Sequence, residues 1–166
     1  MTIDVRIVGD KEAVAYLKSM PATIRKGLSD GIKKQWFRLQ AHVVSQKLSG
    51  QVLKRRTGVL ASSINVGGGQ SASEFIDSGS GDIIGRVGTK VRYAGVHEYG
   101  GTVNIPAHQR RLTMVYGKPV TPKMINVSAH NARFPERSFL RSSLRDRRAE
   151  IIAGLTQAVG EAIDSK

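Results

Sequence analysis

The spacing of apolar residues along the first third of the chain predicts a long amphipathic helix. From position 24 the apolar side chains advance in steps of three and four, and Gly50 ends the pattern. The opposite side carries mainly lysine and arginine. We expect one helix of roughly 25 residues, preceded by a strand over residues 2–8 and a short helix over Lys11–Met20. The apolar stripe consists of Ile24, Leu28, Ile32, Trp36, Leu39 and Val43.

Shorter elements are predicted in the middle of the chain. Thr57 is placed to cap a short helix over Val59–Ile64. A strand is expected from Asn65 onward, after which Glu74–Ile76 and Asp82–Gly88 read as paired strands around a turn rich in glycine and serine. The pattern is that of an α+β protein.

Residues 101–134 predict an extended hairpin or long insertion. Strand-like runs at Val103–Ile105, Leu112–Tyr116 and Met124–Val127 alternate with glycine and proline. Connections of this length in a compact domain are usually functional or ordered by a partner.

A second long helix is predicted over Ser138–Ile163. Its later turns carry an apolar stripe suited to packing against another helix, made of Ile151, Ile152, Leu155 and Val159. Earlier turns are cationic on the same side, and a strip with spacing 4, 4 and 3 is formed by Arg137, Arg141, Arg145 and Arg148. Like charges at this spacing repel. We expect protein carboxylates to offset the strip; DNA or plain solvation are the alternatives.

Composition places the chain in the class of basic assembly or binding proteins. Its 166 residues fit a single domain over 1–166, and the net charge of +13 favours an anionic partner. Residues 101–150 alone hold ten basic and three acidic residues. Neither a membrane span nor a secretory leader is expected, which predicts a protein made in a cytoplasm.

The sequence offers no convergent set of residues for catalysis. No histidine pair has helical metal-ligand spacing and there is no cysteine, so neither a metal nor another cofactor is expected. His97-Glu98 superficially matches the start of a metalloprotease motif, but Gly101 stands where the second histidine belongs. The glycine clusters lack the flanking residues of a phosphate-binding loop. The chain is therefore not expected to be an enzyme.

Three motifs occur in a characteristic order. The first is Thr57-Gly58 with Leu60, Ser63 and Ile64; the second is Val87-Gly88-Thr89 followed by Tyr93, Ala94, His97, Glu98, Tyr99 and Gly100; the third is Pro135, Arg137, Phe139 and Leu140. Together they resemble the tail-completion, or virion-morphogenesis, family of long-tailed bacteriophages. Ser138 stands where members of that family often have a second proline.

The resemblance implies a structural protein of the head–tail junction that completes or caps the tail tube and joins it to the head connector. It implies a curved antiparallel sheet flanked by the two long helices, with the insertion at about 101–134. It also implies a homo-oligomeric ring, expected to be a hexamer, which contacts neck, connector and tube proteins and lies near double-stranded DNA in the channel. The protein would be located in the virion after assembly in the host cytoplasm.

Contacts with other subunits or partners are expected from ten residues: Tyr93, His97, Glu98, Tyr99, Gly100, Arg137, Phe139, Arg141, Arg145 and Arg148. Two other functions remain open. One is a small basic protein that binds nucleic acid through phosphate contacts, which the net charge favours. The other is a toxin-like nuclease, for which the sequence offers no acid or histidine cluster.

Overall fold

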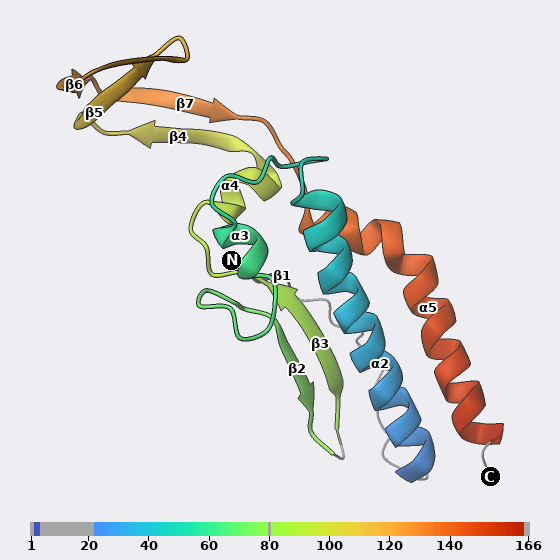
Figure 1. The fold of residues 1–166 in the computed structure, drawn as a ribbon. Helices are drawn as coiled ribbons and strands as arrows, with labels where there is room; N and C mark the ends of the chain where they lie inside the picture. Colours follow the sequence, from blue (N-terminus) through green and yellow to red (C-terminus); the bar gives the residue numbers. More distant parts are fainter. Residues whose placement is uncertain (1, 4–21, 80, 165–166) are drawn as a thin grey trace.

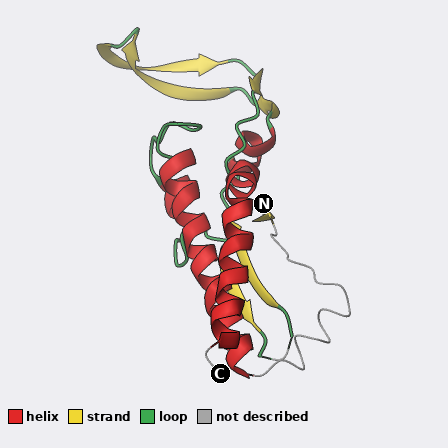
Figure 2. Cartoon of the chain, turned by 90° about the vertical axis from the view of Figure 1, so that its right-hand side faces the viewer, coloured by secondary structure: helices red, strands yellow, loops and turns green. Residues whose placement is uncertain are grey.

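Two long helices dominate the fold. The computed structural model describes residues 2–3, 22–79 and 81–164. Helices α2 (Ala22–His42) and α5 (Leu140–Asp164) lie side by side, and a π-helical turn, η1 (Val43–Lys47), continues α2 (Figures 1 and 2). Both long helices are thus confirmed. The short helix over 11–20 and most of the strand over 2–8 fall outside the described residues.

Small residues let α2 and α5 approach closely. A Cβ atom at Gly31 would lie 2.7 Å from the Cβ of Ala158, and one at Gly27 would lie 2.5 Å from the Cβ of Ala162. Contacts this short exclude larger side chains, because interiors are packed to the density of organic crystals. The helices are therefore held by a pair of small-residue rows spaced four apart, one on each helix.

The predicted apolar stripe of α2 is only partly buried. Trp36 and Leu39 are in the core, whereas Ile24 and Leu28 are only half-buried. Gln35 and Gln40, which lie outside the predicted stripe, are buried. The reason is that α2 packs against a sheet as well as against α5. On α5, Ile151 and Leu155 face α2 as expected, whereas 56% of Ile152 is exposed.

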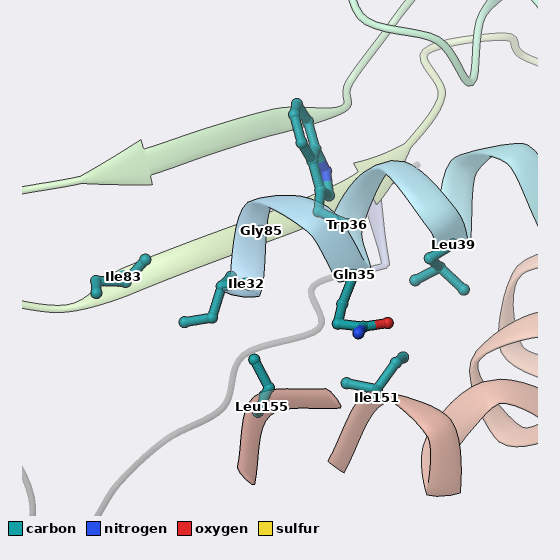
Figure 3. A pocket seen from close by; sticks show the side chains of 8 residues that line it. All are labelled: Ile32, Gln35, Trp36, Leu39, Ile83, Gly85, Ile151 and Leu155. Carbon is teal, nitrogen blue, oxygen red and sulfur yellow. The ribbon is translucent and has the colours of Figure 1, made fainter. Parts of the chain in front are cut away.

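Trp36 fixes α2 on the sheet. A Cβ at Gly85 would lie 3.2 Å from its ring, and its Nε1 donates a hydrogen bond of 2.7 Å to the Arg86 carbonyl. A small cavity of about 40 Å³ remains where α2, the sheet and α5 meet, beside Gln35 and Ile151 (Figure 3).

The strands form three small antiparallel sheets. β1 (Thr2–Ile3), β3 (Ile83–Gly88) and β2 (Glu74–Asp77) pair in the order β1-β3-β2, which confirms the two strands expected around the turn. β4 (Gly101–Ile105) pairs with β7 (His130–Phe134), and β5 (His108–Val115) pairs with β6 (Lys118–Val127).

The expected single curved sheet is therefore wrong. Gly100, after α4, and Gly101, the first residue of β4, both have positive φ, 69° and 136°, and they change the direction of the chain between α4 and β4. Within the described part of the chain, β4 to β7 pair only with one another, as two hairpin-like strand pairs that project beyond the helices (Figure 1). We call residues 101–134 the arm. Its paired strands confirm the expected hairpin.

The core lies where η1, α3 (Val59–Ser62), α4 (Ala94–Tyr99) and the start of α5 meet. Phe139, Ile64 and Val43 are fully buried there. The first turn of α5 is thus anchored in the core, with Leu140 buried beside Phe139. No helix in the described parts of the chain is apolar over a stretch that would cross a bilayer.

Two predictions for the middle of the chain need correction. The short helix α3 ends at Ser62, and its N-cap position is Gly58 at φ 79°, not Thr57. The strand expected from Asn65 is a series of turns, closed by hydrogen bonds such as Ser71 N–H to the Gly68 carbonyl at 2.9 Å. Gly67, at φ 82°, breaks the extended backbone there.

Candidate functional site

Glu98 joins α4 to the beginning of α5. Its fully buried carboxylate accepts hydrogen bonds from the backbone N–H groups of Phe139 at 2.8 Å and Leu140 at 2.9 Å. It also accepts bonds from Arg141 N–H at 2.9 Å and from the Ser138 hydroxyl at 2.8 Å. The first N–H groups of a helix have no partner within it and carry partial positive charge. Glu98 therefore caps α5 from another part of the chain.

Arg141, in the first turn of α5, binds both Glu98 and Glu136. Its Nε lies 3.2 Å from the Glu98 carboxylate, and its Nη2 donates to the Glu98 carbonyl at 2.9 Å and to the Glu136 carboxylate at 2.8 Å. Its guanidinium carbon also lies 4.4 Å from the centre of the Tyr99 ring, within the range of a cation–π contact. Arg141 is thus occupied within its own subunit.

Gly100 lets the two segments approach. A Cβ at this position would lie 2.8 Å from the Glu136 nitrogen, and its φ of 69° is strained for any other residue. Beside it, the Arg137 N–H donates to the His97 carbonyl at 2.8 Å. The turn after α4 and the entry into α5 therefore form one rigid junction.

The junction alters two pKa values. Burial of Glu98 raises its pKa, but the hydrogen bonds from Leu140, Arg141, Ser138 and Phe139 together outweigh burial and hold it below the usual value. The pKa of His97 is lowered, first by burial and then by the nearby Arg137 charge. Glu98 is accordingly ionised and His97 neutral near pH 7.

A cleft with a volume of about 490 Å³ opens beside this junction, at the base of the arm. It is lined by the loop 53–58 and by Tyr93, His97, Phe134 and Arg137. The His97 ring makes edge contacts with both Tyr93 and Phe134, with centroids 5.9 and 6.2 Å apart. We call this feature the cationic cleft.

The cationic cleft combines an apolar floor with a basic rim. The floor includes Leu48, Leu60 and Ala61, whereas the rim carries four cations: Lys54, Arg55, Arg56 and Arg137. None of the described residues that line it is acidic. Gly58 helps to form the rim, because a Cβ there would lie 2.9 Å from Nη2 of Arg55. Such a surface suits an anionic ligand with an apolar portion.

The residues predicted as contacts fall into two groups. Tyr93, His97 and Arg137 line the cationic cleft, and Tyr99 is exposed beside it. Glu98 and Phe139 are fully buried, so neither side chain offers a surface to a partner; this corrects the role expected for them. Their physical role is internal, since Glu98 caps α5 and Phe139 fills the core. Gly100 acts through its backbone, as described above.

The expected strip of four arginines is divided by the structure. Arg137 precedes α5 and Arg141 is bound to Glu98 and Glu136, so both differ from the exposed pair Arg145 and Arg148. Glu136 and Asp146 lie close to the strip in the sequence, whereas Glu98 lies 43 positions from Arg141 and is not detectable from local spacing. Asp146 instead binds Lys47 at 2.6 Å.

The rim residues of loop 53–58 were not among the predicted contacts. Lys54, Arg55 and Arg56 are consecutive basic residues, but nothing in the sequence places them in the same cleft as Arg137. No group of three or more metal-ligating side chains occurs among residues 2–3, 22–79 and 81–164. Comparison with protein-family models, with curated proteins and with solved structures gives no match for this chain.

Proposed function

We propose that this chain is a structural protein of a bacteriophage head–tail junction, which completes or caps the tail tube and joins it to the head connector. The observation that carries the proposal is the convergence of the three motifs behind the family resemblance. Thr57-Gly58, the turn Tyr93–Gly100 and the entry Phe134–Leu140 lie far apart in the sequence, yet they surround one junction and one cleft. Three motifs that meet at one place in the fold support the family resemblance more strongly than any one of them alone.

The arm supports a role in contacts between proteins. It contains five basic residues and no acidic one. Tyr116, at the turn between β5 and β6, is fully exposed, and Met114 and Met124 on those strands are each more than half exposed. Two-stranded ribbons are marginally stable in water on their own, so contact with a partner would both stabilise the ribbon and cover these apolar side chains.

The assembly we propose is a homo-oligomeric ring, with six copies on the strength of the family resemblance. A ring needs two different complementary surfaces on each subunit. The projecting arm provides one of these surfaces. The exposed Arg145 and Arg148 on α5 have a different role, which is to bind carboxylates of a neighbouring neck or tube protein. The proposal includes neither a catalytic role nor a cofactor.

The proposal is tested in the phage or prophage that encodes the chain. We expect deletion of the gene to yield separate heads and tails or unfinished tails in electron micrographs, and plasmid expression to restore joined particles. Arg145→Glu with Arg148→Glu should abolish this rescue while leaving the circular dichroism of the purified protein unchanged, because both side chains are exposed. Normal joined particles from the deletion strain would refute the proposal.

The arm also favours a second candidate, a protein that binds duplex DNA through phosphates. A two-stranded ribbon fits the major groove, and this one carries only positive charge. Affinity would then fall steeply with salt, by a slope set by the number of phosphates contacted. A ring of constant size across salt concentrations supports the junction role, whereas a monomer whose duplex binding is lost with salt supports this alternative.

A further inference from the structure

We propose that the cationic cleft binds an acidic polypeptide segment that carries an apolar side chain, supplied by a protein other than this chain. The inference rests on the proposed function only for the source of that segment, a neighbouring protein of the assembly. The chemistry itself follows from the walls and floor of the cleft.

Among residues 22–79 and 81–164, no carboxylate forms a salt bridge with Lys54, Arg55, Arg56 or Arg137 of the rim. Glu98, the buried acid nearest to it, already accepts hydrogen bonds from the first turn of α5. Glu136, adjacent to Arg137, is bound to Arg141 at 2.8 Å. Lys54, Arg55 and Arg56 of the loop and Arg137 all line the cleft, so an anion bound in it would lie among four cations. Arginine forms bidentate pairs with carboxylates.

The floor distinguishes a peptide from a simple anion. Leu48 and Ala61 belong to the apolar core and reach the floor of the cleft, and the Phe134 ring lines its wall. Inorganic phosphate would gain nothing from these groups, whereas a leucine or phenylalanine would exchange water for apolar contact. A volume of about 490 Å³ accommodates one or two side chains.

The shape argues against duplex DNA in the cleft. A space of about 490 Å³ is only about 10 Å across if it is treated as a sphere. The major groove of B-DNA alone is about 12 Å wide, and phosphates lie on a convex surface. DNA therefore fits the projecting arm better than the cationic cleft. The arm and the cleft use different residues, so each can be altered by mutation without changing the other.

The test uses the full chain and fluorescein-labelled peptides in an anisotropy titration at about 0.1 M salt, near physiological screening. The probe is EEDLFDEE, with EEDSSDEE and QQNLFNQQ as controls for the apolar and acidic parts. We expect binding of the first peptide only. Arg55→Glu with Arg137→Glu should weaken it by on the order of tenfold or more, because two attractive charges become repulsive.

A matched control keeps the net charge change the same. Lys26→Glu with Lys34→Glu alters two exposed cations of α2 away from the cleft, and it should leave affinity within about twofold. If the Arg55→Glu/Arg137→Glu variant does not fold, Arg55→Gln with Arg137→Gln replaces it as the cleft variant in the titration. Equal loss in the Lys26/Lys34 variant, or equal binding of EEDSSDEE, would overturn the proposal.

Two competitors identify the occupant. If a 20-base-pair duplex displaces the probe as effectively as unlabelled peptide, the cleft is a general polyanion surface and the inference fails. If the Arg55→Glu/Arg137→Glu variant, whose own cleft no longer binds the probe, displaces the probe from the unmodified chain, the occupant is a second copy and the assignment to another protein is wrong. Particle assembly is scored separately: peptide binding with normal particles in the deletion strain refutes only the junction role.

Discussion

Glu98 is a fully buried side chain whose pKa is nevertheless below the usual glutamate value. The carboxylate is stable there because donors of the α5 N-terminus replace the water that it loses. We predict that Glu98→Gln lowers the free energy of unfolding by roughly 2–4 kcal/mol, since the amide NH₂ would face backbone N–H donors. Urea denaturation followed by circular dichroism measures this loss.

Glu136→Gln is the matched control, because Glu136 binds the same Arg141 but from an exposed position. Its effect should stay within about 1 kcal/mol, as for other exposed ion pairs. Equal effects of the two substitutions would mean that Arg141 pairing, and not the cap on α5, stabilises the junction.

At the scale of elements, the contact between α2 and α5 depends on where glycine stands. Gly31→Ala should destabilise by roughly 1–3 kcal/mol, because the new Cβ would overlap Ala158 on the neighbouring helix. Gly160→Ala, on α5, meets no atom within 4 Å and should instead stabilise by about 0.5–1 kcal/mol through helix propensity. Thermal or urea unfolding compares the two variants.

The compensating exchange makes this test specific. Gly31→Ala together with Ala158→Gly moves the methyl group to the other helix and should recover part of the lost stability. If Gly31→Ala and Gly160→Ala shift stability in the same direction, close approach of the helices does not control the packing.

At the scale of the whole molecule, the pKa shifts predict that acid destabilises the folded chain in two stages. The pKa of His97 is lowered, so the folded state resists its protonation and stability begins to fall below about pH 6.5. The pKa of Glu98 is also lowered; its contribution is complete above about 4.5 and is lost as pH falls through the folded value.

Urea midpoints measured between pH 8 and pH 3 test this prediction. Glu98→Gln should flatten the lower stage and His97→Gln the upper one. Asp77 and Asp146, whose pKa values are lowered by hydrogen bonds from Ser29 and Lys47 respectively, add to the lower stage in every variant. A wild-type profile that rises on acidification would contradict the assignment.

The sequence by itself determined the elements whose pattern is local. The four-residue steps from Ile24 to Val43, the alternation around the turn after Asp77 and the breaks in 101–134 are properties of neighbouring residues. They correctly predicted two long helices, a pair of strands and a hairpin in 101–134.

Only the tertiary structure decided which faces are buried and which charges are neutralised. The close approach of Gly31 to Ala158 is invisible in a hydrophobic pattern, because small residues carry no strong signal. The cap on α5 joins Glu98 to a turn some forty residues later. Loop 53–58 meets Arg137 only because α4 lies against the entry of α5. Such long-range contacts depend on how elements pack, and local spacing does not encode them.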